Sequence, residues 1–94
     1  MATNDELRLA LGDPDWRDDL KKVESAMLAE PARPLVLDAT GCRGVGTLAM
    51  QLIIAARRHA EAERRPFRIE NATEGLRAEA ALTGLSDALF GESA

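Results

Sequence analysis

A continuous apolar run that ends in a polar, glycine-rich turn constrains the fold of this chain most. Leu35, Val36 and Leu37 follow one another without a polar residue, Asp38 ends the run, and the turn 39–46 carries three glycines. An uninterrupted apolar strand is typical of a strand buried on both faces, at the centre of a parallel sheet. The segment Pro34–Ala56 therefore predicts a central strand, a turn and a helix that begins near Thr47.

Strand-like and helix-like patterns alternate over the rest of the chain. They predict a strand at 6–11, then a helix at 14–29 with Trp16, Leu20, Val23 and Met27 on one face. After the central strand they predict a helix at 47–63 and a strand at 67–70. A third helix, capped by Asn71 or Thr73, is expected to end near Gly84, before an apolar tail at 85–90. Such alternation predicts an α/β fold with right-handed crossovers and helices packed on the sheet. On the second helix we expect Leu48, Leu52, Ala55 and Ala56 to face inward and Met50 to face outward.

Composition narrows the classes of function. Ninety-four residues fit one domain, and the net charge of −4 argues against nucleic acid as a partner. One basic cluster, interleaved with Glu61 and Glu63, is expected to form a solvated helix face; it comprises Arg57, Arg58, Arg64 and Arg65. One cysteine and one histidine provide neither a disulfide nor a zinc site, and no run is long enough to insert in a membrane. The start of the chain lacks the pattern of a secretory signal, so we expect a cytoplasmic protein without a cofactor.

Three phrases, in this order and spacing, resemble a STAS domain, the fold of bacterial anti-sigma factor antagonists: RPLVLDATG, LAMQLIIAARRHAEAERRPFRIENAT and LTGLSDALF. The resemblance covers about residues 6–90. It implies a single α/β domain with a mixed, mostly parallel sheet of about four strands and helices packed on it. Residues 1–5 and 91–94 are expected to be flexible ends.

The chain departs from the family where phosphorylation occurs. Phosphorylatable members carry Asp-Ser-Ser-Gly at the start of the helix after the central strand; here those positions are Gly46, Thr47, Leu48 and Ala49. The usual acceptor, the second serine, is therefore Leu48. The altered turn, with Gly46, Leu48 and Gln51, is similar to small stand-alone STAS proteins found with bacterial chemotaxis components. It is also similar to the STAS subunits that bind the ATPase of lipid-transport ABC systems, which carry a threonine at the place of Thr47.

The resemblance implies a non-enzymatic module that docks on a protein, either a chemotaxis kinase, an anti-sigma-type kinase or a transport ATPase. The expected surface comprises Asp38, Gly46, Thr47, Leu48, Met50 and Gln51. Thr47 can be a helix cap, a cap that also contacts the partner, or a phosphoacceptor. Asp38 can hold the turn or help to position a kinase's magnesium ion. An alternative is a sensor of a small anion or nucleotide at the same helix start, although the turn RGVG lacks the lysine of a phosphate-binding loop.

Overall fold

Three parallel strands form the sheet of the protein. The computed structural model describes residues 5–91, and in it β1 (Leu7–Ala10), β2 (Leu35–Asp38) and β3 (Phe67–Glu70) lie in the order β1-β2-β3. Both pairs are parallel, and Leu35 is level with Leu7 on one side and with Phe67 on the other. The central place of the apolar strand is thus confirmed. Apart from Asp5 and Gly91, the predicted flexible ends lie outside the described residues.

The expected fourth strand is wrong for the part of the chain that the structure describes, where all three strands are parallel. Only the family resemblance implied a fourth strand, whereas the alternating patterns of the sequence provide three. The apolar tail, the remaining candidate, forms the helix α5 (Ser86–Phe90), which buries Leu89 in the core.

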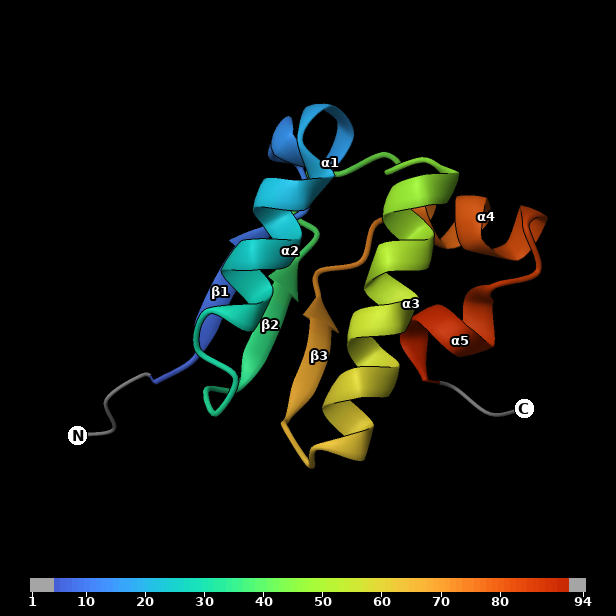
Figure 1. Ribbon diagram of the computed structural model, residues 1–94. Helices are drawn as coiled ribbons and strands as arrows, with labels where there is room; N and C mark the ends of the chain where they lie inside the picture. The colour runs from blue at the N-terminus through green and yellow to red at the C-terminus, as the bar shows by residue number, and fades with distance from the viewer. Residues whose placement is uncertain (1–4, 92–94) are drawn as a thin grey trace.

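Four further helices accompany the sheet: α1 (Asp15–Asp18), α2 (Leu20–Leu28), α3 (Thr47–Ala62) and α4 (Glu74–Leu82). In Figure 1, α2 and α3 lie in front of the sheet, and α4 and α5 lie beside α3. The predicted single helix at 14–29 is broken at Asp19, which has φ −152° and ψ 70°. Because aspartate is a good N-cap, the Asp19 carboxylate accepts the Lys22 N–H and starts α2 as a separate helix.

The buried face of α3 differs from the predicted one. The residues that α3 buries are Ala49, Met50, Ile53, Ile54 and Ala60, whereas Leu48 and Ala55 are exposed and Leu52 and Ala56 are half-buried. α3 contacts α2 and β3 on the sheet side and α5 on another side, so the face it buries is rotated and wider than a single stripe. On α1 and α2 the stripe is confirmed, with Trp16, Val23 and Met27 buried.

The basic cluster is only partly solvated. Arg58 and Arg64 are exposed, and Arg57 lies over the Phe67 ring at 5.4 Å. Arg65, in contrast, is 8% exposed, because it folds back and donates hydrogen bonds to main-chain carbonyls near the end of α2. A sequence pattern cannot distinguish such a residue from its exposed neighbours.

No helix of the described residues is long and apolar enough to cross a membrane.

Candidate functional site

The candidate site lies where β2 ends and α3 begins. In Figure 1 the turn between them runs across the upper end of the molecule, between α1 and α4. Because parallel strands end at the same edge of a sheet, the polar residues that follow β2 and β3 meet there. Asp38 at the end of β2 accepts hydrogen bonds from Thr40 N–H (3.0 Å), Thr40 Oγ1 (2.6 Å) and Asn71 Nδ2 (3.0 Å).

These hydrogen bonds define the role of Asp38. They favour the ionised carboxylate and lower the pKa of Asp38 to about 2, with the Thr40 hydroxyl as the largest cause and Asn71 next. Asp38 therefore contacts the start of the turn through Thr40, which agrees with the first of the two roles considered. Within residues 5–91 no group of three or more His, Cys, Asp or Glu side chains could hold a metal ion.

The last part of the turn is bound by Glu79 of α4. One carboxylate oxygen accepts the N–H of Val45 at 2.9 Å and the other accepts the N–H of Gly46 at 2.8 Å. An anion at these amides satisfies donors that would otherwise need water or a ligand. The Glu79 carboxylate is thus the anion at the N-terminal end of α3.

The first part of the turn is bound by the start of α4. Thr73 donates from Oγ1 to the carbonyl of Cys42, and the same oxygen accepts the Leu76 N–H as the N-cap of α4. Gly75 packs so closely that a Cβ would lie 2.6 Å from the carbonyl oxygen of Arg43. α4 and its N-cap therefore hold the part of the turn from Cys42 to Gly46.

Thr47 is not a helix cap. The N-cap of α3 is Gly46, at φ 86° and ψ 163°, and no side chain caps this end. An N-cap residue needs non-helical dihedral angles, and Gly46 provides them, so Thr47 is already the first helical residue. Its side chain is exposed and makes no hydrogen bond to the described residues.

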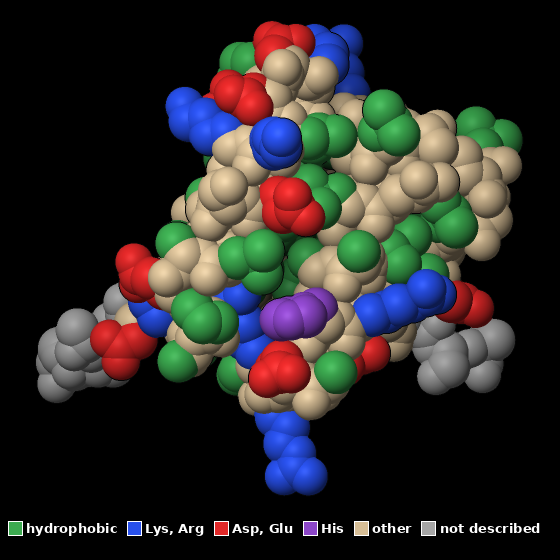
Figure 2. Space-filling view, viewed as in Figure 1, with side chains coloured by type: hydrophobic (Ala, Val, Ile, Leu, Met, Phe, Trp, Pro, Cys, Tyr) green, Lys and Arg blue, Asp and Glu red, His purple; other side chains and the backbone are tan. Residues whose placement is uncertain are grey.

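Leu48 places a large apolar side chain on the surface at this end of the molecule. It is 73% exposed, although large apolar side chains are usually buried. It lines a shallow depression of about 260 Å³ together with Trp16, Arg17, Leu20 and Val45. Arg17 is the charged residue among those that line the depression. Figure 2 shows hydrophobic side chains at the surface of this upper end.

The structure separates the other two predicted site residues. Gln51 is exposed and lies one turn after Thr47 and Leu48, so these three share a face of α3. Met50 was expected to face outward, which is wrong: it is 0% exposed. Its Sδ accepts a contact from the Thr83 hydroxyl at 3.5 Å, so the end of α4 reaches Met50. Met50 belongs to the core.

Residues 4–91 match the family model described as "Mlab, STAS domain". Neither the curated proteins nor the solved structures gave a match.

Proposed function

The chain belongs to the STAS-domain family, and we propose that it docks on a protein partner through the surface at the start of α3. STAS domains are regulatory modules that bind other proteins. We define the docking surface as Thr47, Leu48 and Gln51 together with the depression lined by Trp16, Arg17, Leu20 and Val45.

The exposed side chain of Leu48 carries this proposal. An isolated exposed leucine needs no explanation, but Leu48 borders a depression that is also lined by Trp16 and Leu20. A partner that covers Leu48 and places an apolar side chain in the depression would remove apolar area from water on both sides. Each such side chain contributes about 1.5–3 kcal/mol when fully buried.

The contacts of Glu79 bear on the alternatives at this site. The Glu79 carboxylate accepts the N–H groups of Val45 and Gly46, so its negative charge beside the start of α3 disfavours a second anion there. A phosphate on Thr47 would add negative charge next to Gly46, whose N–H already donates to the Glu79 carboxylate. Both considerations favour a permanent docking surface rather than a phosphorylation switch or an anion sensor.

The partner we propose is a signalling kinase of the chemotaxis or anti-sigma type. A second candidate is the ATPase of a lipid-transport ABC system. Thr47 supports including this second candidate, because the STAS subunits of those systems, which the altered turn resembles, carry a threonine at the place of Thr47. In both cases the proposed role is regulatory and without chemistry of its own.

An affinity pull-down from the native cell with matched variants tests the proposal. We expect wild-type protein to enrich one kinase or one transport ATPase, and Leu48→Asp to lose it. Leu82→Asp is the control, because Leu82 is equally apolar, is 88% exposed and lies on α4 outside the docking surface. Loss of the partner with both variants, or with neither, would contradict docking through Leu48.

A series at Thr47 then separates its remaining roles. If Thr47 contacts the partner, Thr47→Ala and Thr47→Glu should weaken the enrichment and Thr47→Ser should retain it. If Thr47 is a phosphoacceptor, Thr47→Ala and Thr47→Glu should differ from each other in the partner they retain. Circular dichroism of each variant verifies that α3 is unchanged.

A further inference from the structure

A second hollow lies between α2 and α3, on the face that Figure 2 presents. It has a volume of about 250 Å³. Its lining comprises Glu24, Met27, Leu28, Leu35, Leu52, Ala55, Ala56, His59 and Arg65. Figure 2 shows hydrophobic side chains along this hollow, with the histidine at one end. It shares no lining residue with the depression beside Leu48.

One wall of the hollow contains a buried charge. Arg65 is the charged residue that the described part of the chain buries, at 8% exposed. It donates from Nε to the Arg33 carbonyl (2.5 Å), from Nη1 to the Met27 carbonyl (2.8 Å) and from Nη2 to the Glu30 carbonyl (3.1 Å). A guanidinium carries more N–H donors than these three bonds use, so donors remain for a ligand.

Arg65 makes no ion pair with a carboxylate of residues 5–91. Glu30 accepts a hydrogen bond from Arg65 with its main-chain carbonyl, but its carboxylate pairs with Arg33 at 2.6 Å instead. Burial alone lowers the pKa of Arg65, and no neighbouring carboxylate raises it again. Main-chain carbonyls near the end of α2 accept hydrogen bonds from Arg65, but no carboxylate neutralises its charge, so the positive charge in the wall of this apolar hollow is complementary to an anion.

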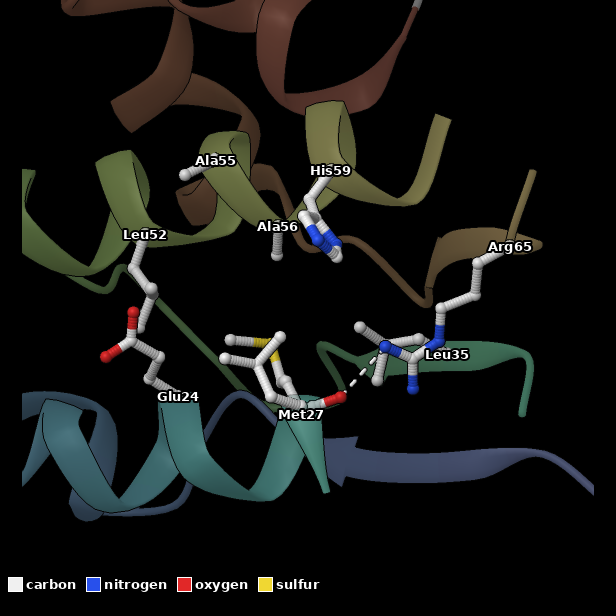
Figure 3. Close-up of a pocket in the computed structure, with 9 residues that line it drawn as sticks. Glu24, Met27, Leu35, Leu52, Ala55, Ala56, His59 and Arg65 are labelled. Atoms are coloured by element: carbon white, nitrogen blue, oxygen red, sulfur yellow. Dashed lines mark hydrogen bonds between the residues drawn. The ribbon is translucent and has the colours of Figure 1, made fainter. Parts of the chain in front are cut away.

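The hollow has a polar end and an apolar body. Figure 3 shows His59 pointing from α3 into the space and Arg65 reaching toward Met27 from the same end, whereas Leu52 and Glu24 lie at the other end. The body between them is formed by Met27, Leu35 and Ala56. Sites for small molecules combine an apolar lining with a few polar groups that fix orientation, and this hollow has that composition.

We propose that this hollow binds a linear amphiphile with a carboxylate head, of the fatty-acid type, with the carboxylate at Arg65 and the hydrocarbon chain along Met27 and Leu52. Arg65 pairs with the head by charge and by its remaining N–H groups, and His59 adds a second donor at that end. The apolar body removes the chain from water and offers few groups to a nucleotide or a sugar. This binding is independent of docking through Leu48, because the two sites share no residue.

Titration of the full chain with sodium dodecanoate, below the concentration at which it forms micelles, tests the proposal. We expect ¹H–¹⁵N spectra to shift at residues of the hollow and at the Arg65 Nε–H, and the docking surface to stay unchanged. Dodecanol has the same chain without the charge, and we expect it to bind at least tenfold more weakly. Equal affinity for the two probes, or shifts only at the docking surface, would overturn the proposal.

A variant that fills the hollow distinguishes binding of dodecanoate in the hollow from unspecific adsorption on the protein surface. Ala56→Leu places a larger side chain in the lining and leaves Arg65 in place, so we expect it to weaken dodecanoate binding at least tenfold. Ala62→Leu is the matched control, on an exposed position of the same helix outside the hollow, and should bind as wild type does. Unchanged binding in Ala56→Leu would overturn the proposal.

A second copy of the chain could also cover the hollow. A dilution series of the wild type without ligand examines this. If the same residues shift with protein concentration alone, and dodecanoate does not reverse the shift, the hollow is a contact between copies and the proposal is wrong.

Discussion

The carboxylate of Glu79 lies across the entrance to α3 and accepts the Gly46 N–H at 2.8 Å with one oxygen and the Val45 N–H at 2.9 Å with the other. Glu79 and Gly46 are 33 positions apart in the chain, so the contact fixes α4 against the turn that carries the docking surface. The shape of that surface therefore depends on a helix that contributes none of its exposed residues.

Glu79→Gln should loosen the turn without unfolding the protein. A glutamine has one acceptor oxygen where the carboxylate has two, so one of the two N–H groups loses its partner. An unpaired, partly buried donor costs about 1–3 kcal/mol, so we expect the free energy of unfolding, measured in urea, to decrease by about that amount. Hydrogen exchange of the Val45 and Gly46 amides should become faster. Glu63→Gln, an exposed position at the end of α3, is the control and should change neither quantity.

The sequence predicted the framework of the fold well, because its signals are local. Apolar runs and alternation identified the three strands and the central place of Leu35–Leu37, and the Asp38 side chain at the end of that run was expected to hold the turn. The break at Asp19 was missed because the apolar stripe of Trp16 and Val23 continues in phase across it.

The parts of the site that depend on tertiary contacts could not be predicted. Nothing in the sequence around Glu79 indicates that it reaches back to Gly46, since an acidic residue on an amphipathic helix is ordinary. The orientation of α3 was misjudged because α5 covers a second side of it; in the structure Leu48 is exposed and Met50 is buried. Trp16 lies in the core as expected, but that it also lines the depression beside Leu48 follows only from the position of α1.

Met50→Ala should destabilise the protein strongly, whereas Gln51→Ala should not. Met50 is 0% exposed, and truncation of a buried large side chain leaves a cavity that costs about 2–5 kcal/mol. Gln51 is exposed, and we expect its substitution to change the free energy of unfolding by less than about 0.5 kcal/mol. Urea unfolding of both variants measures the difference. Equal, small effects would contradict the burial of Met50.

Arg65→Lys should destabilise the protein although it retains the charge. The planar guanidinium of Arg65 reaches three carbonyls, those of Met27, Glu30 and Arg33, and a lysine ammonium cannot match this geometry. Loss of charge-assisted bonds in a buried place predicts a decrease of about 2–4 kcal/mol in the free energy of unfolding. Arg64→Lys is the control, because Arg64 is adjacent and exposed. Similar stabilities of the two variants would show that the carbonyls do not need the guanidinium.

Asp38 should make the stability of the protein decrease in acid. The hydrogen bonds from Thr40 and Asn71 lower its pKa in the folded protein from the ordinary value of 3.8 to about 2. A carboxylate with a lowered folded pKa contributes stability that is complete above its ordinary pKa and is lost as the pH falls toward the folded pKa. We therefore expect the Tm of the wild type to fall more steeply than that of Asp38→Asn between about pH 5 and about pH 2. In Asp18→Asn, which changes an exposed carboxylate of α1, the slope should match the wild type. Parallel curves for the wild type and Asp38→Asn would mean that the turn does not depend on the ionised carboxylate.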